Sequence, residues 1–440
     1  MNKNKPKTVA FLTLGCKVNT YDSEAMAEYF KQAGYTLVEF KDFADVYVVN
    51  TCTVTHISDR KSRAMLRRAR RHNPKAVVVA AGCYAQVSPE TLLKMPEIDL
   101  VVGNKNRHAI VQMVEKFMTD AHKTDYTQDV MHDHCFEPLA VTHNMGKTRA
   151  VIKVQEGCNQ FCTYCIIPFS RGGIRSRDIA STEAEVKTLV KNGYQEFVVT
   201  GIHLASYGKD LDADVSLIDL LRAIDAIEGV KRIRLGSLDP RLMTATFIEE
   251  SYALKHLCPH FHLSLQSGSD GVLKRMGREY TAADYQKIVE NIRAVYPNVA
   301  MTTDVMVGFP GETDAEFKET LTFVKTIQFY QVHVFKYSKR SGTKAASYTD
   351  QVDETVKNRR SAELLDVVHL YERQFLEAHI GQTLAVLYEK AVQKDLYEGH
   401  TPQYMKVLTA SNKNITGKIL KTALQLEESN KSLEMKGLLT

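Results

Sequence analysis

Long hydrophobic runs are missing from this sequence. No apolar stretch approaches the ~20 residues that a membrane-spanning helix needs, and residues Met1–Lys7 lead directly into the strand-like run Thr8–Leu14. A secretory signal would place a longer apolar segment there. The eight cysteines are therefore expected to be metal ligands or reactive thiols in a reducing compartment, and not disulfides. We expect a cytoplasmic protein with no membrane partner.

The sequence also lacks a fourth metal ligand near its densest group of cysteines. Cys158, Cys162 and Cys165 lie within eight residues, and the next histidine is His203. Structural zinc takes four protein ligands, and ferredoxin-type runs place a fourth cysteine close by. Three thiolates are able to hold three irons of a 4Fe-4S cluster and to leave the fourth iron open for a small molecule. Zinc remains the competing interpretation of this group.

This CxxxCxxC run resembles the signature of the radical S-adenosylmethionine superfamily. The resemblance implies that S-adenosylmethionine chelates the open iron and is cleaved to a 5′-deoxyadenosyl radical. It also implies that Tyr164, just before the third cysteine, lies against the adenine of this cofactor.

Three apolar runs in the first hundred residues each end in a cysteine, and a helical pattern follows each run. The runs and their cysteines are Val9–Gly15 with Cys16, Val46–Thr51 with Cys52, and Ala76–Gly82 with Cys83. Alternating strands and helices predict a parallel, doubly wound sheet, whose strands end at one ligand-binding edge. The three cysteines, 36 and 31 positions apart, are thus expected to converge and to hold a second 4Fe-4S cluster. The alternative is that each is a small buried hydrophobe.

The residues around these cysteines resemble the N-terminal domain of the methylthiotransferases. The matching contexts are Gly15–Asn19 with Asp22–Glu24, Asn50–Val54 and Gly82–Gln86. The resemblance, which spans nearly the whole chain, implies that Cys16, Cys52 and Cys83 hold an auxiliary 4Fe-4S cluster carrying the sulfur to be inserted. Lys17 and Val18 after the first cysteine are most similar to the subfamily that acts on threonylcarbamoyladenosine in tRNA.

Six further apolar runs between residues 148 and 379 end in small or polar residues. All but the last are followed by a helical pattern, which predicts a partial (β/α)6 barrel with its site at the strand ends; the superfamily resemblance implies the same fold. The expected contacts to S-adenosylmethionine or the substrate are Gly201, Ser237, Gln266, Asp304 and Glu312. Arg175 and Arg177 are also expected to face cofactor or substrate, because guanidinium groups bind carboxylates and phosphates. Two solvated arginines on a surface loop are the alternative.

Positive charge is concentrated near the N-terminus. Residues 1–80 hold 14 Lys and Arg against 7 Asp and Glu, and most of the excess lies in the helical pattern at 56–72. Such a run is able to neutralise RNA phosphates, and the candidates are Arg67, Arg68, Arg70 and Arg71. A solvated helix face is the equal alternative.

Residues 380–440 alternate short apolar runs with polar turns, which predicts a small β-barrel. The stretch Tyr397–Tyr404 resembles the hallmark of the TRAM domain, an RNA-binding β-barrel. We expect Tyr397 and Tyr404 to stack on unpaired bases, and Lys406 and Lys418 to meet phosphates. Both tyrosines suit the core of the barrel equally well.

The predicted α/β chain therefore has four parts. They are an N-terminal domain with an auxiliary cluster (1–118), a linker (119–147), a radical S-adenosylmethionine barrel with a trailing helix (148–379) and a TRAM-like barrel (380–440). Cys135 and Cys258 receive no function, and His132 and His134 are expected in a polar loop and not in a metal site.

The resemblance implies a tRNA methylthiotransferase that acts at C2 of threonylcarbamoyladenosine beside the anticodon. It implies two 4Fe-4S clusters, S-adenosylmethionine, an electron donor such as flavodoxin or ferredoxin, and a sulfur source. The alternative substrates are isopentenylated adenosine in tRNA and an aspartate of a ribosomal protein. A non-catalytic iron-sulfur sensor that binds RNA is a further alternative.

Overall fold

The N-terminal part of the chain forms a six-stranded parallel sheet in the computed structural model, which describes residues 6–142, 148–212, 214–429 and 432–440. The strand order is β2-β1-β3-β4-β5-β6. This order changes direction between β1 and β3, and open parallel sheets bind ligands at such a point. The strands are β1 Thr8–Thr13, β2 Thr36–Val38, β3 Val46–Thr51, β4 Val77–Gly82, β5 Leu100–Val102 and β6 Thr124–Asp125.

Helices cover both faces of this sheet, which is doubly wound as predicted. Side chains alternate in direction along a strand, so that Val48 packs with α1 and α5 whereas Val49 packs with α2 and α4. Helix α1 begins at Lys17, directly after Cys16, because Gly15 (φ +103°) turns the chain out of β1. The helices are α1 Lys17–Gln32, α2 His56–His72, α3 Cys83–Val87, α4 Pro89–Leu93 and α5 Ile110–Asp120.

The expected linker is partly built into the N-terminal domain. Helix α5 runs past residue 118, and β6 pairs with β5 at the edge of the sheet. Further along, Leu139 and Val141 are buried against Tyr21 of α1 and Val198 of the central domain. Residues 143–147, the end of that linker, lie outside the described residues. The described part of the connector therefore packs the two domains together.

Six parallel strands form the central domain in two groups, β11-β10-β7 and β12-β13-β14. Parallel bridges from Ile233 to Leu257 and from Leu238 to Leu263 join the groups, which gives the open partial barrel that the sequence predicted. The strands are β7 Arg149–Lys153, β10 Glu196–Thr200, β11 Arg232–Leu235, β12 His260–His262, β13 Ala300–Val307 and β14 Gln331–Lys336.

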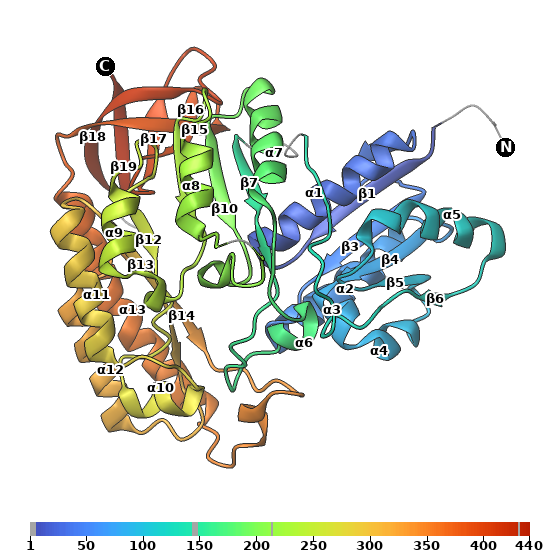
Figure 1. Ribbon diagram of the computed structural model, residues 1–440, viewed down its shortest axis with the longest axis horizontal. Coiled ribbons are helices and arrows are strands. Elements are labelled where there is room, and N and C mark those ends of the chain that lie inside the picture. Colours follow the sequence, from blue (N-terminus) through green and yellow to red (C-terminus); the bar gives the residue numbers. More distant parts are fainter. Residues whose placement is uncertain (1–5, 143–147, 213, 430–431) are drawn as a thin grey trace.

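Helices form the outer layer of this barrel and bury one large apolar core against the strands (Figure 1). They are α7 Ile179–Lys191, α8 Leu217–Asp225, α9 Ala245–Tyr252, α10 Asp270–Met276, α11 Ala282–Val295, α12 Asp314–Ile327 and α13 Glu354–Glu377. Short elements lie in the connections: β8 Gln155–Glu156, α6 Ile167–Arg171, β9 Arg175–Ser176 and the 3₁₀ turns Arg107–Ala109, Leu204–Ser206, Pro240–Leu242 and Lys344–Ser347. None of the described helices is both long and apolar enough to cross a membrane.

The C-terminal strands close into a five-stranded barrel in the order β15-β16-β17-β19-β18, which confirms the predicted small β-barrel. Its apolar interior is continuous with Tyr330 and Leu376 of the central domain. In Figure 1 the N-terminal sheet lies to the right of the central strands and the C-terminal barrel lies at the upper left. The strands are β15 Thr383–Gln393, β16 Leu396–His400, β17 Lys406–Ala410, β18 Ile419–Ser429 and β19 Ser432–Leu439.

Candidate active site

Three cysteines of the N-terminal domain, here called the N-terminal triad, meet at the carboxyl edge of its sheet. Cys16 follows β1 and precedes α1, Cys52 follows β3, and Cys83 follows β4 as the first residue of α3. Because β1, β3 and β4 are neighbours in the sheet, their ends lie side by side. The Sγ atoms of Cys16 and Cys83 each lie 3.8 Å from Oδ1 of Asn19.

Gly15 and Asn19 hold the N-terminal triad in place. A Cβ atom at Gly15 would lie 3.1 Å from Sγ of Cys52, so a larger residue would crowd this thiol. The buried Asn19 donates hydrogen bonds from Nδ2 to the carbonyls of Leu14 and Thr51, at 2.7 and 3.1 Å. Asn19 therefore ties the end of β1 to the end of β3 and turns its Oδ1 toward the thiols.

The other three cysteines, the loop triad, lie in one loop that the antiparallel β8–β9 pair closes at its base. Within this loop the N–H of Cys165 donates to the carbonyl of Cys162 at 2.9 Å. Burial raises the pKa of the Cys158 thiol to about 11 and the pKa of the Cys165 thiol to about 12. As free thiols these groups are therefore protonated and poorly hydrated.

The spacing and chemistry of both triads suit a 4Fe-4S cluster. Neither triad, among the described residues, brings its three sulfurs within 4.8 Å of one another. Zinc–sulfur bonds of ~2.3 Å would require sulfurs about 3.8 Å apart, so the wider spacing of these thiols favours a cluster over a single zinc ion. Burial also raises the pKa of Cys52, and a cluster would supply the positive charge that a buried thiolate lacks. Each triad offers three thiols, which would leave the fourth iron of such a cluster without a protein ligand.

A cavity of about 860 Å³ adjoins the loop triad and reaches Cys16 of the N-terminal triad. Cys16 lines it from the N-terminal domain, and Cys158, Cys162 and Cys165 line it from the central domain. The sequence-predicted residues in its wall are Tyr164, Gly201, Ser237, Gln266 and Asp304. A cavity of this volume fits a small-molecule cofactor, and it opens where the strands of the partial barrel end.

One cluster of charges in the cavity wall surrounds Asp239. The guanidinium of Arg278 lies 3.6 Å from this carboxylate and 3.5 Å from Sγ of Cys162. Nε2 of His203 lies 3.5 Å from the same carboxylate. Burial alone would raise the pKa of Asp239, but hydrogen bonds from His203 and Arg241 hold it well below its usual range. Asp239 therefore stays ionised and holds Arg278 beside the loop triad.

Two histidines and an aspartate meet at another part of the wall, on β12, β13 and β14. The ligand atoms of His262, Asp304 and His333 lie within 4.8 Å of one another, and no other described group of His, Cys, Asp and Glu is as tight. Nε2 of His262 lies 3.2 Å from Oδ2 of Asp304. These side chains give a polar surface to the cavity that the loop triad also lines.

Three of the predicted contact residues do not line the cavity. Arg175 is buried and donates to backbone carbonyls, and Arg177 is buried in an ion pair with Glu185. Glu312 is also buried, because it pairs with Arg360 at 2.8 Å. The expectation that these side chains face cofactor or substrate therefore differs from the structure, in which their charges are compensated inside the protein.

Two family models match this chain: an uncharacterized protein family, UPF0004, over residues 8–103, and the radical SAM superfamily over residues 152–324. The threonylcarbamoyladenosine tRNA methylthiotransferase MtaB of Bacillus subtilis (strain 168) is 42% identical over 422 residues, which cover 95% of this chain and 93% of that relative. The chain belongs to the radical S-adenosylmethionine methylthiotransferase family. The predicted family, α/β fold and enzymatic nature are thereby confirmed, and membership of this superfamily brings a 4Fe-4S cluster and S-adenosylmethionine as cofactors.

Other relatives broaden this comparison. The tRNA-2-methylthio-N(6)-dimethylallyladenosine synthase of Clostridium tetani (strain Massachusetts / E88) is 35% identical over 430 residues, which cover 95% of this chain and 94% of the relative. Among solved structures, the radical S-adenosylmethionine methyltransferase TsrM from Kitasatospora setae aligns with a TM-score of 0.56 at 15% identity, over 76% of this chain and 75% of TsrM. The likeness to TsrM concerns the fold alone.

The methylthiotransferase exposes only part of the arginine set predicted on α2. Arg67, Arg68 and Arg71 are exposed. Arg70 instead donates to backbone carbonyls and pairs with Asp99 at 2.6 Å. It fastens α2 to the sheet and has no donor left for a phosphate.

The predicted RNA contacts of the C-terminal barrel also divide into two kinds. Lys406 and Lys418 are exposed, whereas Tyr397 is buried in the core of the barrel. Tyr404 lines the cavity, and the guanidinium groups of Arg149 and Arg234 lie 5.0 and 4.9 Å from the centre of its ring. Tyr404 is thus enclosed by cations instead of being free to stack on a base.

Sequence reasoning missed several residues of the methylthiotransferase site. Lys17 and Asn19 lie within the motif Gly15–Asn19, which resembles the family pattern. The motif was therefore a signal from which these two residues could have been identified. Arg171 and Arg278 carried no signal, because their sulfur partners are 88 and 116 positions away in the sequence.

The cysteines outside the triads stay apart from the site. Cys135 is exposed and Cys258 is buried, and neither lines the cavity. His132 is exposed and pairs with Asp129 at 2.6 Å. The segment 132–135 forms no tight metal-binding group within the described residues.

Proposed function

We propose that this enzyme adds a methylthio group to C2 of N6-threonylcarbamoyladenosine beside the anticodon of tRNA. The observation that carries the proposal is the single cavity that Cys16 shares with the loop triad. A sulfur donor and a radical source must both reach one carbon atom, and this cavity provides the common space. The relatives that bear the threonylcarbamoyladenosine name, at 42, 40 and 36% identity, support the choice of substrate.

The proposal assigns the superfamily cluster to the loop triad and a second 4Fe-4S cluster to the N-terminal triad. When bound, the cluster of the loop triad and S-adenosylmethionine supply a carbon radical that removes hydrogen from an unactivated C–H bond. The chain contributes placement, because its side chains shape the cofactor space between the two triads. We assign this shaping to Tyr164, Gly201, Ser237, Gln266 and Asp304.

A cation in the cavity suits a substrate that bears a carboxylate. The threonyl group of threonylcarbamoyladenosine carries a carboxylate, and a dimethylallyl group carries none. Lys17 lines the cavity, where desolvation and the positive charges of Arg149 and Arg234 lower the pKa of its ammonium group. A charge-assisted hydrogen bond from Nζ to the carboxylate would fix the modified base in position. We assign Lys17 this role.

The anticodon loop suits this site because its bases are single-stranded and can be turned out without melting a duplex. We assign phosphate contacts to the exposed cations of α2 and of the C-terminal barrel: Arg67, Arg68, Arg71, Lys406 and Lys418. The proposed reaction also needs a one-electron donor such as flavodoxin or ferredoxin, and a source of sulfur. We assign the activity to the cytoplasm.

A second candidate substrate is dimethylallyladenosine in tRNA, which the name of the 35% identical Clostridium tetani relative favours. Both substrates require the same two triads and the same cavity. The two substrates differ in the charge of the group on N6. Lys17 should therefore favour the substrate with the carboxylate over the one with the neutral dimethylallyl group.

Mass spectrometry of tRNA nucleosides from cells with and without the gene tests the proposal. We expect loss of 2-methylthio-threonylcarbamoyladenosine alone, restored by the wild type and by Cys135→Ala but not by Cys52→Ala. Cys135 is a matched control because it is an exposed cysteine outside both triads. Loss of the dimethylallyl derivative would keep the chemistry and change the substrate. An unchanged profile would reject a tRNA substrate in favour of a ribosomal protein or a sensor.

A further inference from the structure

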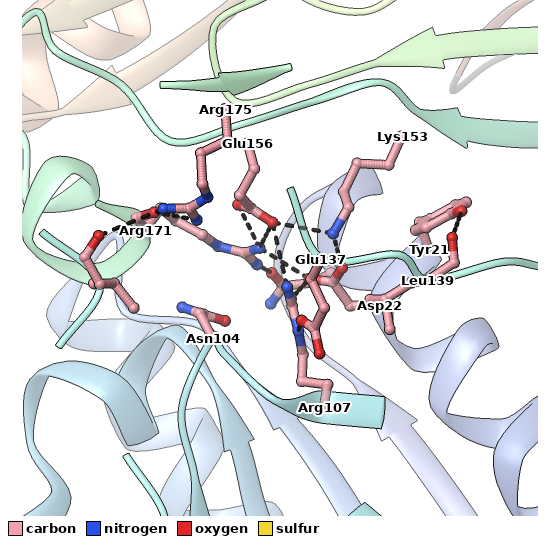
Figure 2. Close-up of polar contacts among 12 residues, drawn as sticks. Tyr21, Asp22, Asn104, Arg107, Glu137, Leu139, Lys153, Glu156, Arg171 and Arg175 are labelled. Carbon is pink, nitrogen blue, oxygen red and sulfur yellow. Dashed lines mark hydrogen bonds and ion pairs between the residues drawn. The ribbon is translucent and has the colours of Figure 1, made fainter. Parts of the chain in front are cut away.

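A buried network of ion pairs connects the N-terminal triad to the loop triad, and Arg171 lies at its centre. Arg171 is the last residue of α6, which follows the loop triad, and it is 0% exposed. Its Nη1 lies 2.9 Å from Oδ2 of Asp22 and 2.9 Å from Oε1 of Glu156. Asp22 belongs to α1, which begins after Cys16, whereas Glu156 belongs to β8, just before the loop triad. Figure 2 shows Arg171 between these two carboxylates.

The other members of the network compensate these carboxylates independently of Arg171. Lys153 lies 2.6 Å from Asp22 and 3.0 Å from Glu156, and Arg107 also pairs with both. Arg107 is 1% exposed and reaches Glu137 at 2.8 Å (Figure 2). Burying so many charges costs free energy of desolvation, so stability alone is a weak reason for a third cation at this point.

Arg171 differs from the other two cations because it contacts a sulfur. Its Nε donates a hydrogen bond to Sγ of Cys83 at 3.1 Å. Nδ2 of Asn104 approaches the same sulfur at 3.6 Å and donates to the carbonyl of Ser170 at 2.7 Å. Within the described residues, Cys16 and Cys52 receive no such bond from an arginine, so Cys83 is the one sulfur of its triad with a charged donor.

Arg171 also contacts Asn19, which lies beside the thiols of the N-terminal triad. Nη2 of Arg171 donates to Oδ1 of Asn19, the oxygen that lies 3.8 Å from both Cys16 and Cys83. One arginine therefore orders the edge of the N-terminal triad and fixes it to the strand that leads into the loop triad. Arg107 and Lys153 share the carboxylates but have no contact with a cysteine in the described residues.

We propose that Arg171 is a positioning residue that raises the reduction potential of the cluster on the N-terminal triad. A hydrogen bond from a cationic donor withdraws electron density from a ligating sulfur and stabilises the reduced cluster. Asn104 adds a weaker contribution of the same sign because it is neutral and farther away. The inference rests on the proposed function, which assigns a cluster to this triad.

The test uses the full chain with Cys158→Ala, Cys162→Ala and Cys165→Ala, reconstituted anaerobically with iron and sulfide, so that the remaining cluster is that of the N-terminal triad. Arg171→Lys keeps the charge that compensates Asp22 and Glu156 but lacks the Nε–H that faces Cys83. A redox titration is followed by electron paramagnetic resonance. At a fixed potential, the ratio of oxidised to reduced cluster should be about tenfold higher in Arg171→Lys than in the same protein with Arg171 intact. For one electron this corresponds to a shift of about 59 mV to lower potential.

Arg107→Lys is the matched control, because it changes the same network at a cation without a sulfur contact. Equal shifts in the two variants would overturn the inference, since they would show a general effect of the network. If Arg171→Lys does not fold, Asn104→Ala decides: a smaller shift to lower potential supports the inference, and no shift overturns it. Absence of bound iron in the triple-cysteine protein would instead overturn the second cluster of the proposed function.

Discussion

The two cysteine triads hold equivalent thiols by different means. The loop triad occupies eight consecutive residues, 158–165, and a single loop closed by the β8–β9 pair sets its geometry. The N-terminal triad draws one cysteine from the end of each of three strands, and its geometry exists only when β1, β3 and β4 pair in register. The loop triad is therefore a local structure, whereas the N-terminal triad is a property of the whole domain.

The supporting contacts follow the same division. In the loop triad, backbone groups within the loop act at short range, as when the N–H of Cys165 donates to the carbonyl of Cys162 at 2.9 Å. In the N-terminal triad, side chains bridge separate elements: Asn19 joins two strand ends, and Arg171 arrives from the other domain. Loss of one side chain is expected to disturb the N-terminal triad more than the loop triad.

The largest expected effect comes from removing one ligand of each triad. Cys158→Ala should abolish cleavage of S-adenosylmethionine, because the loop triad would lose a ligand of the cluster that cleaves it. Cys52→Ala should leave cleavage measurable and abolish sulfur insertion. Each variant should bind about half of the iron of the wild type, since one of two four-iron clusters is lost. Chromatography of 5′-deoxyadenosine and mass spectrometry of the modified nucleoside measure the two activities separately.

Equal loss of both activities in Cys52→Ala would contradict this division of labour. It would mean that the N-terminal triad serves something other than delivery of sulfur. Cys135→Ala, which should retain both activities, controls for the general effect of replacing a cysteine.

The difference between the triads also explains what the sequence was able to predict. The loop triad follows from spacing alone. The N-terminal triad followed from a rule of topology, that neighbouring parallel strands end at one edge, applied to Cys16, Cys52 and Cys83. The partial barrel and the C-terminal barrel followed from the same alternation of strands, helices and turns.

Partners of charged side chains were beyond this reasoning. Arg175 and Arg177 were expected at the cofactor because of their charge, but Arg177 has its carboxylate, Glu185, on the next helix. Arg70 has its partner Asp99 at the start of a distant strand. An arginine in a sequence can be identified as a hydrogen-bond donor, but the sequence does not show which acceptor it will contact. Tertiary packing determines which acceptor lies near it. Arg171 was missed for the same reason, since its sulfur partner Cys83 is 88 positions away.

The dependence of the N-terminal triad on long-range contacts predicts a sensitive position at Arg340. This arginine follows β14, is 5% exposed, and forms an ion pair with Asp59 and a hydrogen bond to Thr53, next to Cys52. Arg340→Met should lower sulfur insertion on the order of 100-fold, as expected for a misplacement of about 1 Å at reacting groups. Cleavage of S-adenosylmethionine should change much less, because the loop triad does not use this contact.

Lys339→Met is the control for Arg340, because it removes a neighbouring but exposed cation. It should retain both activities. A parallel fall of cleavage and insertion in Arg340→Met would show that the contact supports the whole protein and not the N-terminal triad in particular.

A smaller effect is expected at Lys17, which adjoins the N-terminal triad but is assigned to the substrate. Lys17→Met should raise KM for tRNA bearing threonylcarbamoyladenosine by about 10- to 100-fold, because a hydrogen bond to a charged group contributes about 1.5–3 kcal/mol. The iron content should stay at the wild-type level. Steady-state kinetics with tRNA bearing the methyl ester of the threonyl group provides the comparison, since wild type and variant should then differ little. An equal defect on the ester would assign Lys17 to the triad and not to the carboxylate.

The smallest effect is expected on α2, the helix that follows Cys52, where neighbouring arginines have different roles. Arg71→Gln should weaken tRNA binding a few-fold and lower the slope of log K against log salt by about 0.7–0.9, the amount for one phosphate contact. Arg70→Gln should leave this slope unchanged and reduce thermal stability, because its guanidinium is used by internal carbonyls and by Asp99. Binding isotherms at several salt concentrations and thermal melts measure the two effects. If Arg70→Gln reduced the slope while Arg71→Gln did not, the exposed side of α2 would have no contact with RNA.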